Sequence, residues 1–161
     1  MIRLSEKKDL DRILELYDSG RARMRAAGNS IQWVNGYPSA DNVLQDIQNG
    51  TGFVMEENGT VCAAFAFIVG PDPTYTEIDR MYPEDLPYGT IHRIASDGIR
   101  HGVLQECLDY CLTVIPRVRV DTHADNAVMR RAIQKAGFSE CGVTFLSDGT
   151  PRTVFRIAKS D

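Results

Sequence analysis

Apolar residues along the chain switch between two spacings, which predicts short strands interleaved with amphipathic helices. The helices expected on this basis lie in residues 5–27, 39–50, 103–113 and 126–137, and the strands in residues 2–4, 53–57, 60–69, 90–96, 117–122, 141–146 and 153–158. Asn58-Gly59, between two of these strands, suits a type I′ hairpin turn. The order predicts an α/β fold (α+β mixed sheet) with helices on both faces of the sheet.

Within the helices, the apolar stripes predict which side chains face the core. In the second helix these are Val43, Leu44 and Ile47, with Ser39 as the N-cap and Gly50 as the stop signal. Cys107 and Cys111 share one helix face, as two metal ligands would. They fall in an apolar stripe without a nearby second Cys or His pair, so we expect buried, inert thiols and no metal site.

Length and charge narrow the class of protein. The 161 residues, 43% of them hydrophobic, predict a single domain covering residues 1–161. A net charge of −4 disfavours nucleic-acid binding. No apolar run approaches a membrane span, and Met1–Leu10 carries charges where a signal peptide needs an apolar stretch. We therefore expect a cytoplasmic protein without a membrane partner.

Two segments are candidates for binding. Residues 70–89 hold four of the seven prolines and three of the six tyrosines, which predicts a long loop that contributes to a binding surface. Residues 97–102 join a strand to a helix, where free N–H groups and the helix dipole favour an anion. The donors would be the amides of Arg100 to Leu104, with the Arg100 side chain as an added positive charge. The alternative is that Gly102 serves turn geometry alone.

The segment from Thr90 to Phe138, with Gly102, Asn126 and the Ala-Gly-Phe ending of Val120–Phe138 (VDTHADNAVMRRAIQKAGF), resembles the GNAT superfamily of acyl-CoA N-acyltransferases. This resemblance implies a GNAT-like fold with a central, mostly antiparallel sheet, and acetyl-CoA as cosubstrate. It also implies a pyrophosphate held by main-chain amides of the loop and a pantetheine arm paired with the strand. The implied cofactor-binding residues are Ile94, Ala95, Ser96, Arg100, His101, Gly102, Val103, Leu104 and Asn126.

The chain departs from the family pattern at three positions. Ile99 and Leu104 stand where the family loop usually carries a Gln or Arg and a small residue. A bulky Leu104 is expected to narrow the cofactor channel. Ile133 stands where the family often has a Tyr that protonates the departing thiolate. Tyr82, Tyr88 or a water molecule remain as candidates for that proton.

His92 is the candidate catalytic base, because it lies on the strand that would border the acyl group and an imidazole titrates near neutral pH. The alternative is a histidine with a purely structural role. Main-chain amides near Ala95 are candidates for stabilising the thioester oxygen.

Acceptor residues are expected in the segment between the first two helices and in the long loop. Trp33, Tyr75 and Tyr88 are the substrate candidates. The acids of the long loop would attract a cationic amine, namely Glu77, Asp79, Glu84 and Asp85. The alternative is that the acids solvate the loop and Trp33 packs beneath it. Arg21, Arg23 and Arg25 are expected to face solvent. The alternative is a substrate that bears a carboxylate, because these arginines lie near the acceptor segment.

The function expected from these features is N-acetyl transfer from acetyl-CoA to a primary amine of a small molecule or peptide by direct attack. The alternative is a catalytically silent acyl-CoA-binding sensor, which the missing Tyr supports. A more distant alternative is a mixed-sheet binding domain without coenzyme A. Pairing of the final strands into a homodimer is a further expectation.

Overall fold

A computed structural model describes residues 1–81 and 87–159 of the chain. These residues fall into two compact units, Met1–Phe67 with His92–Val103, and Ile68–Ile91 with Leu104–Asp161. Each unit is described by itself, and strand β4 contributes residues to both. A single domain of residues 1–161 stays a prediction.

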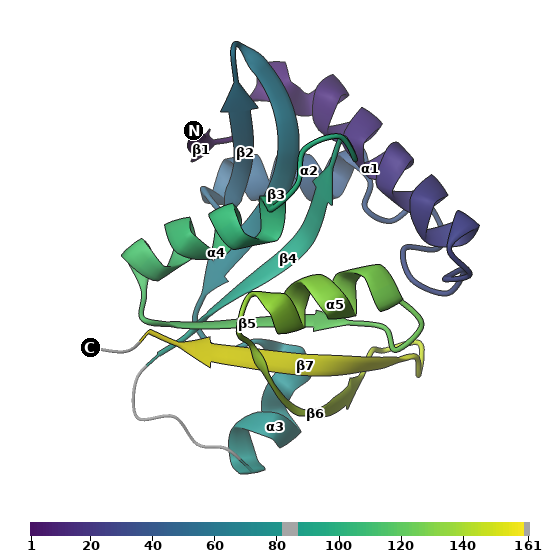
Figure 1. The fold of residues 1–161 in the computed structure, drawn as a ribbon, viewed down its shortest axis with the longest axis vertical. Helices are drawn as coiled ribbons and strands as arrows, with labels where there is room; N and C mark the ends of the chain where they lie inside the picture. Colours follow the sequence, from purple (N-terminus) through teal and green to yellow (C-terminus); the bar gives the residue numbers. More distant parts are fainter. Residues whose placement is uncertain (82–86, 160–161) are drawn as a thin grey trace. The chain divides into compact units, whose positions relative to one another are not determined.

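The seven strands follow the order β1-β2-β3-β4-β5-β7-β6 (Figure 1). Their bounds are β1 Ile2–Leu4, β2 Gly52–Glu57, β3 Thr60–Val69, β4 Gly89–Ser96, β5 Arg117–Thr122, β6 Ser139–Phe145 and β7 Pro151–Ala158. Strand β2 is antiparallel to β1 and β3, and β7 is antiparallel to β5 and β6, whereas β4 runs parallel to β5 over Gly89–Ile91. The predicted mixed sheet is confirmed.

The first unit places helices α1 (Leu10–Ala26) and α2 (Ala40–Asn49) against β2 and β3. Its apolar core draws on α1, α2, β2, β3 and β4, and the buried members are Ile13, Leu16, Tyr17, Trp33, Val43, Val54, Val61, Ala64 and Ala95. The Ser39 hydroxyl accepts the Asn42 amide, and Gly50 ends α2 at a φ of 69°, as predicted. The inward position of Leu44 is wrong, because Leu44 is exposed and Asp46 is buried instead.

The hairpin between β2 and β3 has the predicted turn. Asn58 and Gly59 adopt φ angles of 52° and 80°, and Glu57 faces Thr60 across the strands. Positive φ at both central residues is the requirement of a type I′ turn. This part of the fold is therefore set by two adjacent residues.

The second unit contains a helix that the sequence did not predict. A 3₁₀ turn at Pro73–Tyr75 and helix α3 (Thr76–Met81) occupy part of the expected loop. Tyr75 and Ile78 are fully buried and form a core with Tyr88, Cys141 and Val154. This burial stabilises a helix that is too short to form alone.

The other helices of this part of the chain match expectation. Helix α4 spans Val103–Val114, and α5 spans Ala127–Lys135 with the Asn126 side chain as its cap. All four cysteines are buried free thiols, and burial raises the pKa of Cys111 to about 12. Among the described residues, no helix is long and apolar enough to cross a membrane.

Candidate functional site

Strand β4 contains the predicted base, His92, and the residues predicted to bind the pantetheine arm, Ile94 to Ser96. His92, Ile94 and Ser96 are half-buried, whereas Ala95 is buried in the core of the first unit. Arg93, between His92 and Ile94, has a φ of 52°, in the left-handed region that few non-glycine residues adopt. The strand is therefore irregular at the residue next to the candidate base.

The loop from β4 to α4 is partly satisfied by its own side chains. Asp97 Oδ1 accepts the amides of Ile99 at 2.9 Å and Arg100 at 3.3 Å, and Ser96 Oγ accepts the Gly98 amide at 3.2 Å. The Arg100 side chain forms an ion pair with Glu57. Arg100 is thus engaged through both its amide and its guanidinium.

The amides of His101 to Leu104 are better placed to receive an anion. Gly102 has a φ of 76°, is exposed, and has no atom within 4 Å of the position that a Cβ would occupy. Val103 and Leu104 begin α4, so their N–H groups have no acceptor within the helix. The Leu104 side chain is only 7% exposed. A narrowed cofactor channel at this residue stays a prediction.

Asn126 has a clear local role. Its side-chain oxygen accepts the Met129 amide at 3.2 Å and caps α5, and the residue is 9% exposed. Asparagine is among the preferred N-cap residues because its oxygen satisfies a helix N–H. The sequence allows either Asp125 or Asn126 to cap this helix, and the structure shows Asn126 as the cap. Contact of Asn126 with a cofactor stays a prediction.

Tyr75 and Tyr88 lie in a buried polar cluster of the second unit. The Tyr75 hydroxyl donates to Asp121, and the Tyr88 hydroxyl donates to Asp79 at 3.0 Å. The Arg119 guanidinium lies 3.9 Å from the centroid of the Tyr88 ring and 2.5 Å from Asp79. Burial raises the pKa of Tyr88 to about 12. Asp79, an acid expected to attract an amine, is thus paired with an arginine.

Trp33 packs in the first unit. Its ring meets Tyr17 edge-on with centroids 5.5 Å apart, and the residue is 8% exposed. This is the packed position that the sequence offered as the alternative to substrate contact. Contact of Trp33, Tyr75 and Tyr88 with an acceptor stays a prediction. Tyr82, Glu84 and Asp85 of the acceptor segment lie outside the described residues.

The expectation that the arginines of α1 face solvent is wrong for Arg21, which is half-buried, and is confirmed for Arg23 and Arg25, which are exposed. Arg21 donates to the carbonyl oxygens of Tyr37 and Pro38, and its side chain is 14% exposed. Arg23 donates to the Ser96 carbonyl oxygen at 2.5 Å. No such contact is described for Arg25. The contacts of Arg21 and Arg23 were not predicted, because helix spacing alone does not show which loops fold back onto a helix.

A second cluster was missed by sequence reasoning. Arg93 donates to both carboxylate oxygens of Asp46, at 2.7 and 2.9 Å, and to the Tyr37 hydroxyl at 3.1 Å. The available signal was Asp46 itself, an acid three residues after Val43 on the apolar side of α2. In the part of the chain that the structure describes, no group of three or more His, Cys, Asp or Glu side chains is arranged to hold a metal ion.

The structure is similar to the crystal structure of a GNAT-family acetyltransferase from Streptococcus agalactiae. The TM-score is 0.86 and the sequence identity 29%, over 100% of this chain and 96% of that one. This similarity supports the assignment of the chain to the GNAT superfamily. No protein-family model and no curated protein matches its sequence.

Two further structures share the GNAT fold at lower identity. A ribosomal-protein-alanine N-acetyltransferase from Brucella melitensis has a TM-score of 0.63 at 18% identity, over 98% of this chain and 99% of that one. YncA from Salmonella typhimurium, solved with its cofactor acetyl-CoA, has a TM-score of 0.65 at 16% identity, over 100% and 94%. The similarity to the Streptococcus agalactiae acetyltransferase, at 29% identity, supports acetyl transfer as the general activity.

Proposed function

We propose that this GNAT protein transfers an acetyl group from acetyl-CoA to a primary amine of a small molecule or peptide. The observation that carries the proposal is the loop from β4 to α4. It combines an exposed Gly102 at positive φ with the first amides of a helix, in a chain with the GNAT fold. One fold relative is named an N-acetyltransferase, which agrees with an amine acceptor.

The residues of the loop fit a phosphate-bearing cofactor. The space beside Gly102 allows a ligand to approach the main chain closely, and the amides of His101 to Leu104 would hold a pyrophosphate. Acetyl-CoA would supply the reactive thioester. Ile94, Ala95 and Ser96 would bind its pantetheine arm through backbone groups.

His92 would act as the general base. A protonated amine cannot attack a thioester, so a proton must leave the ammonium group first. The imidazole of His92 would accept that proton. Amides near Ala95 would donate hydrogen bonds to the thioester oxygen as its negative charge grows.

Ile133, at the position where the family often has a proton-donating Tyr, supports the alternative function of a catalytically silent acyl-CoA sensor. Ile133 is fully buried and carries no proton to donate. The Tyr88 hydroxyl, another candidate, already donates to Asp79. A sensor would bind acetyl-CoA without releasing free thiol.

Two measurements on the full chain test the proposal. Acetyl-CoA at about 100 times its Kd should raise the free energy of unfolding by about 2.7 kcal/mol, or the melting temperature by about 5 °C or more. Free thiol should then appear with at least one amine of a library at about pH 6 to 9. Binding without thiol release would favour the sensor, and the absence of thermal stabilisation would exclude both functions.

The carboxylate of Asp97 should weaken cofactor binding, because a negative charge in the loop repels a pyrophosphate. Asp97→Asn keeps a neutral acceptor for the Ile99 and Arg100 amides. We expect Asp97→Asn to lower the Kd for acetyl-CoA about twofold to threefold. This is the effect of removing the repulsion between two unit charges that are roughly 8 Å apart in water. Titration calorimetry measures this change.

The matched control is Asp148→Asn, because Asp148 Oδ1 accepts the Thr150 amide in a similar exposed turn. That substitution should leave the Kd unchanged. An unchanged or higher Kd for Asp97→Asn would mean that the Asp97 charge does not face the cofactor.

A further inference from the structure

The backbone of Arg93 is held in an unusual conformation. Its φ of 52° lies in the left-handed region, within strand β4 and directly between His92 and Ile94. The left-handed conformation is unfavourable for a residue with a long side chain. This conformation therefore persists only where surrounding contacts fix the backbone. The contacts of Arg93 therefore identify what shapes β4 at this point.

Two side chains from other segments hold the Arg93 guanidinium. Nη2 donates to Asp46 Oδ1 at 2.7 Å and to Oδ2 at 2.9 Å, and Nη1 donates to the Tyr37 hydroxyl at 3.1 Å. The side chains of Arg93 and Asp46 are 14% and 11% exposed. Because ion pairs at this depth are poorly screened, the contact restrains β4 against α2 more strongly than a surface pair would.

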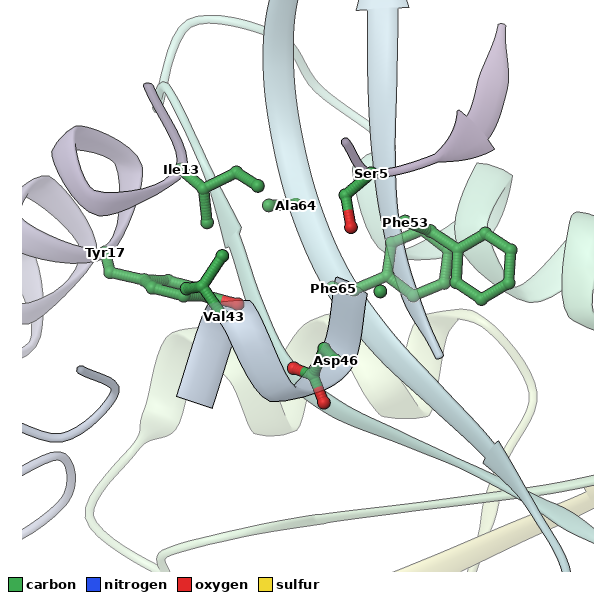
Figure 2. Close-up of a pocket in the computed structure, with 9 residues that line it drawn as sticks. Ser5, Ile13, Tyr17, Val43, Asp46, Phe53, Ala64 and Phe65 are labelled. Atoms are coloured by element: carbon green, nitrogen blue, oxygen red, sulfur yellow. The ribbon is translucent and has the colours of Figure 1, made fainter. Parts of the chain in front are cut away.

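The surroundings of Asp46 increase the strength of this contact. Asp46 borders a small pocket whose walls are mostly apolar (Figure 2), formed by Ile13, Tyr17, Val43, Phe53, Ala64 and Phe65 together with Ser5 and Gly52. Burial also raises the pKa of the Tyr17 phenol, which borders the same pocket. Although burial disfavours its charged form, the contacts with Tyr37 and Asp46 raise the pKa of Arg93.

We propose that Asp46 and Arg93 are positioning residues for acetyl transfer, which fix the irregular turn of β4 between the base and the cofactor strand. Successive side chains of a strand point to opposite faces, so a change of conformation at one residue redirects its neighbours. Loss of the pair would turn His92 relative to Ile94–Ser96. The inference rests on the proposed function, because those residues are the predicted base and cofactor strand.

A purely structural pair and a positioning pair predict different results. A structural pair would lower the melting temperature and leave kcat and KM unchanged well below that temperature. A positioning pair would lower kcat, raise KM for acetyl-CoA, and reduce hydrogen-exchange protection of the β4 amides in the unliganded protein. The last measurement needs no activity.

The variants separate charge, geometry and backbone strain. Asp46→Asn removes one charge, Arg93→Lys keeps the charge but loses the two-pronged contact, and Arg93→Gly permits positive φ without the anchor. We expect each to lower kcat/KM for acetyl-CoA about tenfold. If the guanidinium contact is the cause, the double variant Asp46→Asn, Arg93→Lys should lose no more than either of its single variants.

Asp18→Asn is the control, because Asp18 pairs with Arg21 at 2.7 Å on α1 but its side chain is 78% exposed. It should leave kcat, KM and exchange unchanged. If Asp46→Asn fails to fold, Arg93→Lys provides the same readouts with the charge retained.

The result that overturns the inference is distinct from failure of the proposed function. The positioning role alone is rejected if the wild type binds and turns over acetyl-CoA and the variants behave like it. In that case Arg93→Lys and Arg93→Gly are folded and show wild-type kinetics and wild-type hydrogen exchange of the β4 amides. Wild-type protein that does not bind acetyl-CoA would reject the proposed function and this inference together.

Discussion

Replacing His92 with alanine should lower kcat for acetyl transfer by about 10²- to 10⁴-fold, the range that one general base contributes. The Kd for acetyl-CoA should change by less than about twofold, because the predicted cofactor contacts are main-chain amides of other residues. Stopped assays of thiol release give kcat, and calorimetry gives the Kd.

His92→Gln separates basicity from size, since glutamine is polar and of similar bulk but accepts no proton near neutral pH. It should lose as much activity as alanine. Full activity of either variant at about pH 7 would remove His92 from the mechanism.

The second large effect is expected at Gly102, where valine should weaken acetyl-CoA binding about tenfold to hundredfold. The cause is backbone conformation, because no atom lies within 4 Å of an added Cβ but the φ is 76°. A β-branched residue in the left-handed region costs about 1–3 kcal/mol. The loop is expected to relax to negative φ and turn its amides away from the pyrophosphate.

Gly149→Val is the matched control, since Gly149 has a φ of 85° and equally open surroundings. Both variants should lose similar thermal stability, but only Gly102→Val should lose affinity in calorimetry. Equal affinity of Gly102→Val and wild type would contradict the assignment of this loop to the cofactor.

The elements predicted correctly are those whose signals are local. Asn58-Gly59 specifies a hairpin, Ser39 and Gly50 bound a helix, and Asn126 caps another, because each acts on backbone groups within a few residues. Helix α3 was missed because its six residues depend on burial of Ile78, a contact made with distant strands.

The candidate site divides in the same way. The loop before α4 and its glycine are visible in the sequence, since a strand, a turn and a helix follow one another along the chain. The ion pair between Arg100 and Glu57 cannot be predicted from the sequence, because the two residues are 43 positions apart, from 57 to 100. A side chain expected to contribute charge to the ligand is thereby committed to a neighbour.

The sequence by itself determined the order of the strands and helices along the chain except for α3, the caps at Ser39 and Asn126, the Asn58-Gly59 turn, and the resemblance to the GNAT superfamily. Only the tertiary structure decided which charged side chains are buried and with whom. Leu44 is exposed, contrary to expectation, and Asp46 is buried on α2, where it pairs with Arg93 of β4. The periodicity of apolar residues predicts which side of a helix or strand faces the core. The partner of a buried charge lies far away in the sequence and depends on how whole elements pack together.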